Sequence, residues 1–299
     1  MRRLKVVIFY GGPSYEHEAS LLSAGNIFGL LDVNKYEPQP VFVDRQKHWE
    51  TDPEGVARST DLALIALHGR YGEDGEIQEE LENLHLPYWG SGVLSSALAA
   101  NKALAGRLFR AAGLLTPEFL VVDKRDRVWS DNGLKKEINL PVVVKPVDQG
   151  SALGVTLVRT GDELYPALQK AFGFSQEVMI QDYVFGEVYS VGLIEQRGDV
   201  LPLAPVKAAA GRNQTGLPAK LGEEARHAAV RAHKALGLSG FSKVDLILSE
   251  DGSFYVLEAD TIPNFHRSGL FLKSAAASGL NPKRLLDLAI AEVGRKTVS

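Results

Sequence analysis

The residue types best suited to chemistry are a lysine in the middle of the chain and a group of acids near its C-terminus. Lys145 ends an apolar run and is followed by Asp148–Gly154, a loop rich in small residues. The acids follow much later and are Asp245, Glu258 and Asp260. Lysine and loop amides bind phosphate oxygens, and carboxylates hold a hard cation such as magnesium. The combination predicts a site for a nucleoside triphosphate with magnesium.

The acids belong to a predicted β-hairpin. Two apolar runs flank the dipeptide Asp251-Gly252, which is a strong hairpin-turn signal. A two-residue turn there places Asp245 opposite Glu258, and the strand period of two puts Asp260 on the same face. Acids paired across a ladder repel each other, so we expect a cation between them. The alternative is a solvated face with the pairing shifted by one residue.

The lysines each have a simpler interpretation when taken alone. A lysine that ends a buried strand, such as Lys145, can extend its ammonium to solvent, and Lys102 falls on a predicted helix, where lysines are commonly solvated. The loop after Lys145 is not a Walker A loop, because no Gly-Lys-Ser/Thr follows it. Its small residues, Gly150 and Ser151 among them, still suit close approach by a phosphate.

Two glycine-bearing loops follow predicted strands in the first third of the chain. Gly11–Glu18 follows the strand Leu4–Tyr10, and Ala66–Gly75 follows the strand Leu62–Leu67. Neither loop contains G-x-G-x-x-G, which disfavours a dinucleotide site. Open α/β sheets bind ligands at the carboxyl ends of their strands, so both loops are expected to face one crevice. A capping turn is the alternative role for the ionisable residues of the first loop, including Glu16.

Composition limits the class of protein. The chain has 299 residues, a formal net charge of −4, no cysteine and 45% hydrophobic residues. The charge gives no basis for a nucleic-acid or anionic-membrane partner, and the lack of cysteine excludes disulfides and cysteine zinc sites. The apolar run Val6–Tyr10 is too short for a signal-peptide core or a membrane span. We therefore expect a cytoplasmic protein of two or three domains.

Strand and helix signals alternate up to Gly90–Gly92 and predict a small α/β domain with a parallel sheet. Ser14 is expected to cap a helix over Tyr15–Leu31, and one helix is expected over Val93–Ala112. The polar, glycine-bearing stretch Ala208–Pro218 is predicted to be a mobile loop.

Taken in order, these motifs resemble those of the D-alanine–D-alanine ligases of the ATP-grasp superfamily. The matching segments cover most of the chain and are Gly11–Ser20, Ala66–Gln78, Gly90–Lys102, Val144–Ser151 and Val244–Pro263. The resemblance implies an α/β protein, α+β in its C-terminal part, in which an ATP-grasp fold follows a Rossmann-like parallel-sheet domain. The expected domains are residues 1–92, 93–182 and 183–299.

The resemblance also implies roles for individual residues. The ATP site is expected to use Lys102, Lys145, Gly150, Ser151, Gln181, Asp182, Val184 and Glu187. Two magnesium ions, or manganese in their place, are expected on Asp245, Glu258 and Asp260. The expected catalytic residues are Glu16, Ser151 and Lys243, and the expected substrate-binding residues are Glu16, His68, Asn264 and Ser268.

The implied reaction forms an acyl phosphate of one D-alanine, which the amine of a second amino acid then attacks. The implied partners are ATP and D-alanine in a homodimeric enzyme, with no nucleic acid and no membrane. The alternatives are a related ligase with a different second substrate and a non-catalytic ATP-binding homologue.

The chain departs from the family pattern at several expected site positions. Lys243 stands where the family usually has arginine, and it lacks the planar fork of a guanidinium. Asp260 replaces an asparagine, and Gln181 replaces a glutamate. Val188 falls at the ribose-binding glutamate, one residue after Glu187. The segment between Lys207 and Pro218 is short and contains no tyrosine, whereas the family loop carries one over the substrates. These changes predict a less completely covered site and an altered second subsite.

Overall fold

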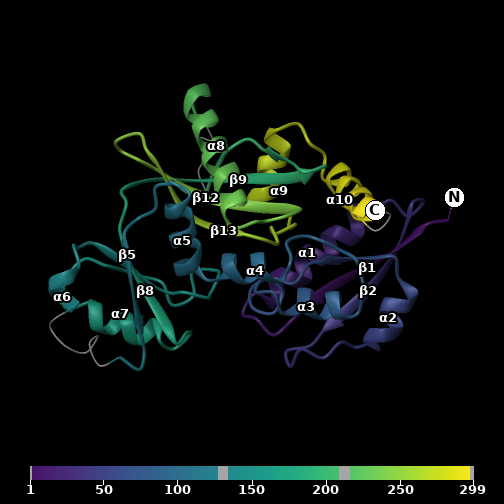
Figure 1. The fold of residues 1–299 in the computed structure, drawn as a ribbon, viewed down its shortest axis with the longest axis horizontal. Coiled ribbons are helices and arrows are strands. Elements are labelled where there is room, and N and C mark those ends of the chain that lie inside the picture. The colour runs from purple at the N-terminus through teal and green to yellow at the C-terminus, as the bar shows by residue number, and fades with distance from the viewer. Residues whose placement is uncertain (1, 127–133, 209–215, 297–299) are drawn as a thin grey trace.

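The computed structural model describes residues 2–126, 134–208 and 216–296. Its strands form three separate sheets, and Figure 1 shows the first and the second of these at opposite ends of the molecule. The first sheet is parallel and has the order β2-β1-β3-β4. Its strands are β1 (Leu4–Gly11), β2 (Tyr36–Val43), β3 (Leu62–Ile65) and β4 (Tyr88–Trp89), with the helices α1 (His17–Leu30), α2 (Pro53–Ser59) and α3 (Glu76–Asn83). The predicted parallel α/β domain is therefore present.

The other two sheets are antiparallel. The second has the order β5-β8-β6-β7, with β5 (Phe119–Asp123), β6 (Val142–Pro146), β7 (Thr156–Val158), β8 (Glu177–Asp182), α6 (Leu134–Glu137) and α7 (Leu164–Ala171). The third has the order β10-β9-β12-β13, and β11 also pairs with β9. Its elements are β9 (Gly186–Gln196), β10 (Asp199–Pro202), β11 (Val206–Lys207), α8 (Ala219–Ala235), β12 (Phe241–Ser249), β13 (Phe254–Asp260), α9 (Leu270–Ala277) and α10 (Pro282–Lys296).

Cores cross the expected domain limits. Ala99 and Phe109, from the helices that follow the first sheet, share a core with Val191 and Val244 of the third sheet. At the other end of the chain, Ile290 of α10 packs with the core of the first sheet. The boundaries at residues 92 and 182 stay predictions, because helices on either side of them pack against sheets that lie far away in the sequence.

The single helix expected over Val93–Ala112 is wrong. The chain forms two helices, α4 (Val93–Ala100) and α5 (Lys102–Ala111), with Asn101 extended between them. The Asn101 side chain accepts hydrogen bonds from the amides of Ala103 and Leu104 and so caps α5. Asparagine favours this local bond over a helix interior. The break makes Lys102 the first residue of α5.

Ser14 does not cap α1 as expected. The helix begins at His17, and Ser14 lies before it in the loop. The Ser14 hydroxyl accepts from the Glu16 amide at 3.0 Å and donates to the His68 carbonyl at 2.5 Å. Because His68 follows β3, this serine joins the two glycine-bearing loops instead of ending a helix.

The hairpin pairs Asp245 with Glu258 as predicted, but its turn differs. The Ser249 amide donates to the Ser253 carbonyl, so three residues form the loop, and Gly252 has a φ of +86° there. The strand residues next to the turn are therefore paired one residue away from the predicted register. A bulge beside Asp245 shifts the register back by one residue, and it places Lys243 opposite Asp260. No helix of the described ranges is long and apolar enough to cross a membrane.

Candidate active site

A cavity of about 620 Å³ lies where loops from all three sheets meet. Its lining contains most of the expected substrate-side and metal-side residues, which are Glu16, His68, Lys102, Gly150, Ser151, Lys243, Glu258, Asp260 and Asn264. The loop between β1 and α1 and the loop between β3 and α3 supply one wall. The hairpin β12–β13 supplies the opposite wall, and the loop after β6 lies between them.

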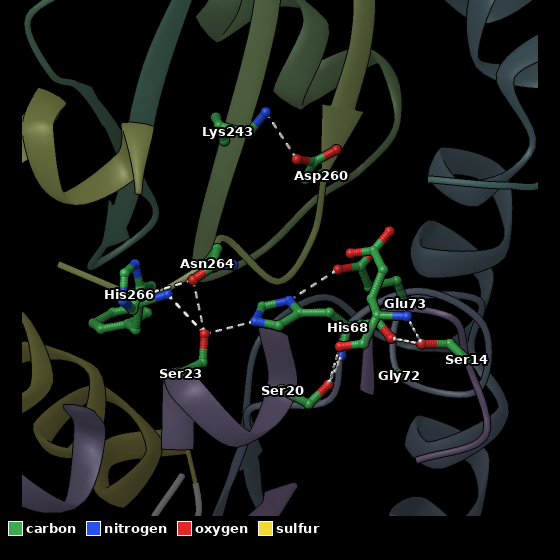
Figure 2. Close-up of polar contacts among 12 residues, drawn as sticks. Ser14, Ser20, Ser23, His68, Gly72, Glu73, Lys243, Asp260, Asn264 and His266 are labelled. Atoms are coloured by element: carbon green, nitrogen blue, oxygen red, sulfur yellow. Dashed lines mark hydrogen bonds and ion pairs between the residues drawn. The ribbon is translucent and has the colours of Figure 1, made fainter. Parts of the chain in front are cut away.

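Hydrogen bonds hold His68 in the first wall (Figure 2). Its amide donates to the Ser20 hydroxyl at 2.9 Å, and its imidazole Nε2 lies 2.7 Å from the Ser23 hydroxyl. Its Nδ1 lies 3.3 Å from Glu73 Oε1. Ser23 also donates to Asn264 Oδ1 at 2.9 Å. His68 is thus fixed from both ring nitrogens, and only 3% of it is exposed.

The expected substrate residue Ser268 lies elsewhere. It is exposed, its hydroxyl bonds to His266 Nδ1, and it is absent from the lining of the cavity. Its neighbour in the prediction, Asn264, does line the cavity, and Asn264 Oδ1 accepts from the His266 amide at 2.7 Å. The short loop after β13 therefore presents Asn264 and turns Ser268 outward.

The loop after β6 approaches Glu16 closely. A Cβ on Gly150 would lie 2.2 Å from Glu16 Oε1, so a larger residue at this position would force the Glu16 carboxylate to move. Ser151 and Ala152 both have positive φ, at 49° and 55°. Within the described ranges, Glu16 and Ser151 line the same cavity, but no hydrogen bond joins them. Their expected pairing stays a prediction, and the observed contact is between Glu16 and Gly150.

The cation expected between the acids is supplied by the chain itself. Lys243 Nζ lies 2.7 Å from Asp245 Oδ2 and 2.9 Å from Asp260 Oδ2. The Ser190 hydroxyl donates to the other Asp245 oxygen at 2.5 Å. The surrounding carboxylates raise the pKa of Lys243 despite its burial. The two departures from the family pattern, Lys243 and Asp260, are therefore direct partners.

The other two lysines lie around Glu258. Lys102 Nζ donates to the Gln149 carbonyl at 2.7 Å and lies 3.7 Å from Glu258 Oε2. Burial lowers the pKa of Lys145 to about 8, with Glu258 opposing this shift. Burial alone would raise the pKa of Glu258, but Lys102, Lys145 and Lys243 together lower it. Lys145 is only 8% exposed, so it is not simply solvated. The positive charges expected to meet phosphate are thus held close to the acidic hairpin.

The adenine-side predictions fall outside the cavity lining. Gln181 and Asp182 end β8, Val184 follows in the connection to β9, and Gln181 is buried. Glu187 lies on β9 and pairs with Lys207 and the Tyr189 hydroxyl. Nothing in this arrangement tests the expected contacts with adenine and ribose, which stay predictions.

The acids fit magnesium only as a partial ligand set. Glu258 and Asp260 line the cavity and offer hard oxygen donors, whereas Asp245 is occupied by Ser190 and Lys243. Across residues 2–126, 134–208 and 216–296, no three Asp, Glu or His side chains are placed to hold a metal ion. Magnesium is commonly bound by one or two carboxylates together with substrate phosphates, so Glu258 and Asp260 suit it in the presence of a nucleotide.

Comparison with known proteins identifies the family. A sequence model of the D-ala D-ala ligase N-terminus matches residues 5–60, and one of the D-ala D-ala ligase C-terminus matches residues 108–211 and 206–291. The chain belongs to the D-alanine–D-alanine ligase family. A D-alanine–D-alanine ligase of Geotalea uraniireducens is 35% identical over 99% of this chain and 97% of its own length. One from Bacillus anthracis is 33% identical over 96% of both chains.

Solved structures of ligases from this family have the same fold. The D-alanine–D-alanine ligase of Coxiella burnetii aligns over 99% of this chain and 95% of its own, with a TM-score of 0.90 and 26% identity. The Bacillus anthracis enzyme complexed with ATP aligns over 98% and 97%, with a TM-score of 0.85 and 31% identity. The expected ATP-grasp fold is confirmed, and membership of this family makes the chain an ATP-dependent ligase.

Two residues that carry the hydrogen bonds around His68 were not predicted as site residues. Glu73 lines the cavity beside His68, and Ser23 links His68 to Asn264. The position of Glu73 in a glycine-rich loop after a strand was a weak signal for a site residue. Ser23 lies inside α1, where serine has no distinctive pattern, so only the packing of the C-terminal loop against that helix reveals its contact.

Proposed function

We propose that the protein joins two D-alanine molecules at the expense of ATP, through an acyl phosphate, for peptidoglycan precursor synthesis. The observation that carries the proposal is the composition of the cavity. One wall presents Glu16 for an ammonium group, and the other presents Lys102 and Glu258 for a phosphate with its cation. An amino acid and the phosphates of a nucleoside triphosphate can therefore meet in one cavity.

The proposal assigns a task to each wall. Glu16 binds the ammonium of the first D-alanine, while Lys102 and Lys145 neutralise the phosphate that its carboxylate attacks. Gly150 and Ser151 cover the phosphates, and His68 and Asn264 form the amino-acid side. Positioning and charge neutralisation are the main contributions that proteins make to phosphoryl transfer.

The metal part of the proposal places two magnesium ions, or manganese, at the acidic hairpin. Glu258 and Asp260 would hold them with phosphate oxygens, and Asp245 would join when Lys243 releases it. Bound there, magnesium would neutralise charge on the transferring phosphoryl group. Once released from Asp245, Lys243 would be available for the negative oxygen of the tetrahedral intermediate.

A different second substrate is the alternative that a specific observation favours. Lys243 is engaged by two aspartates, so its ammonium is less free to bind the carboxylate of a second amino acid than an unpaired cation would be. Hydroxy acids or other amines would then compete with D-alanine.

We also propose that the enzyme works in the cytoplasm, where ATP is made. We propose that it forms a homodimer, and analytical ultracentrifugation tests this oligomeric state.

The decisive experiment is ADP release in the presence of ATP, magnesium and D-alanine, followed by mass analysis of the product. We expect D-alanyl-D-alanine, formed with ADP and phosphate. ADP release without the dipeptide, together with a new product when another acceptor is added, would favour the alternative substrate. No ADP release with any amino acid would contradict the proposed function.

A further inference from the structure

The hydrogen bonds around Ser23 determine where His68 carries its proton. Asn264 Oδ1 accepts from the His266 amide, which identifies that atom as oxygen, and it also accepts from the Ser23 hydroxyl. Ser23 has only one proton to donate. Its oxygen must therefore accept from the Phe265 amide at 3.1 Å and from His68 Nε2 at 2.7 Å. A proton on Nε2 follows, because an unprotonated Nε2 would leave two acceptors facing each other.

The same reasoning applies to the other side of the ring. With Nε2 protonated, Nδ1 of a neutral imidazole is an acceptor, and it faces Glu73 Oε1. A bond between them needs one shared proton, on the carboxyl or on the ring. Burial, reinforced by Asp260 and Glu16, raises the pKa of Glu73 well above its ordinary value, and burial lowers that of His68. The proton therefore rests on Glu73 in the free protein.

Charged side chains from several elements lie near this pair. Glu16 from the β1–α1 loop and Asp260 from β13 favour positive charge on His68, as does the Ile262 carbonyl. The positive charge of Lys102 on α5 acts in the opposite direction to burial and lowers the pKa of Glu73. The other charged side chains lining the cavity are Arg70, Asp74, Asp148, Lys243 and Glu258. An imidazolium at His68 would thus have two carboxylates near it.

The proposed reaction needs a proton acceptor. The ammonium of the second amino acid must lose protons before and during its attack on the acyl phosphate, and a positioned acid–base group accelerates such transfers. The segment between Lys207 and Pro218 contains no tyrosine. Among the groups lining the cavity, Glu73 is hydrogen-bonded to His68, and the imidazole of His68 can take up the proton that Glu73 already carries.

We propose that Glu73 and His68 form the proton-accepting pair for the attacking amine, with Ser23 and Asn264 holding the imidazole in position (Figure 2). The amine nitrogen bonds to the acyl carbon, and phosphate leaves with the electrons of its C–O bond. The ammonium first loses one proton to solvent. After the neutral amine has attacked, its second proton moves to one oxygen of Glu73, while the proton on the other oxygen moves to His68 Nδ1. Each bond broken is matched by one formed, and the positive charge of the amine ends on the imidazole.

This inference rests on the proposed function, and hydroxylamine separates the two. Hydroxylamine is unprotonated at neutral pH and traps acyl phosphates as hydroxamates without needing a base. For Glu73→Gln we expect dipeptide formation to fall about a hundredfold, while hydroxamate formation with ATP and D-alanine stays at the wild-type rate. The residual dipeptide rate should rise steadily with pH, because solution base then removes the proton.

The control is Glu79→Gln, the same change at an exposed position of α3. It should leave both reactions unchanged. Equal losses of dipeptide and hydroxamate in Glu73→Gln would mean a purely structural or binding role, and an undiminished dipeptide rate would remove Glu73 from proton transfer. Either result overturns the inference while leaving the proposed function intact. A wild-type protein that forms neither product would overturn both.

Discussion

The two walls of the cavity are stabilised in different ways. The wall from the β1–α1 and β3–α3 loops is joined by hydrogen bonds through Ser14, Ser23 and His68. The hairpin wall is held by ion pairs, in which Lys243 joins Asp245 and Asp260 while Lys102 lies near Glu258. The first wall is complete without a ligand. The second has balanced its charges internally and must exchange partners when a nucleotide and its cation bind.

The hydrogen-bonded wall and the ion-paired wall therefore contribute differently to ligand binding and to stability. Hydrogen bonds between fixed groups give a prearranged amino-acid site that needs little reorganisation. Buried acids paired with lysines avoid the cost of isolated charges, and removing one partner leaves the other uncompensated. Substitutions in the hairpin wall should therefore alter ligand binding as well as the stability of the fold, whereas removal of a hydrogen bond in the first wall should act mainly on stability.

Glu258→Gln should have the largest effect. It removes a cavity-facing carboxylate of the proposed metal site, and electrophilic stabilisation by a metal is worth several kcal/mol. We expect turnover to fall by at least about a hundredfold at saturating ATP, with the fold retained by circular dichroism. Ordinary turnover at ordinary magnesium concentrations would show that the acidic hairpin does not hold the metal.

Lys145→Ala should weaken nucleotide binding by roughly tenfold or more, because a hydrogen bond to a charged group contributes about 1.5–3 kcal/mol. Calorimetric titration with a non-hydrolysable ATP analogue measures the change. A matched control is Lys170→Ala on α7, whose ammonium bonds to the Val155 carbonyl away from the cavity. Unchanged affinity for the Lys145 variant would remove this lysine from the phosphate site.

The affinity for ATP should also fall as the pH rises through about 8. Burial lowers the pKa of Lys145 to about 8, so below that pH the ammonium is charged and attracts phosphate. Above it the free protein must first gain a proton to bind, and affinity declines. Titrations from pH 7 to pH 9 on the wild type and Lys145→Ala test this, since the variant should lose the decline. A decline of equal size in both would assign it to another group.

Ser23→Ala should destabilise the hydrogen-bonded wall. It removes the shared partner of His68, Asn264 and the Phe265 amide, and leaving buried polar groups without partners costs about 1–3 kcal/mol each. We expect a lower midpoint of urea unfolding, with nucleotide affinity less affected than by Lys145→Ala. Ser95→Ala, on an exposed bond to the Gly237 carbonyl, serves as the control. Equal midpoints for the two variants would show that the network contributes little.

The smallest effect concerns the pair of departures from the family pattern. Lys243→Arg and Asp260→Asn each disturb a contact that the two side chains make with each other, so the double variant should recover part of the loss. Contacting residues commonly show coupling of about 0.5–3 kcal/mol. The measurement is kcat/KM for D-alanine in the four proteins of the cycle. Strict additivity would mean that the two changes act independently.

The sequence alone determined the residue types of the site and the elements that carry them. Glycines and apolar runs predicted β1, β3 and the hairpin, because local turn chemistry and strand alternation need no distant partner. The pairing of Asp245 with Glu258 was predicted as well. Its turn was wrong by one residue, and a bulge in β13, which a simple count of alternating positions cannot reveal, offsets that error before Asp245.

The tertiary structure decided which of these residues meet. Asn101 breaks a continuous helical pattern and places Lys102 at the start of α5, facing the cavity. Lys243 was predicted to act on substrate, yet it forms ion pairs with Asp245 and Asp260. The sequence had predicted both aspartates as metal ligands. Glu73 and Ser23 carry no pattern of their own. Their roles arise because the loop after β13 packs on α1 and brings Asn264 to a serine 241 positions away, a contact that depends on packing between distant segments.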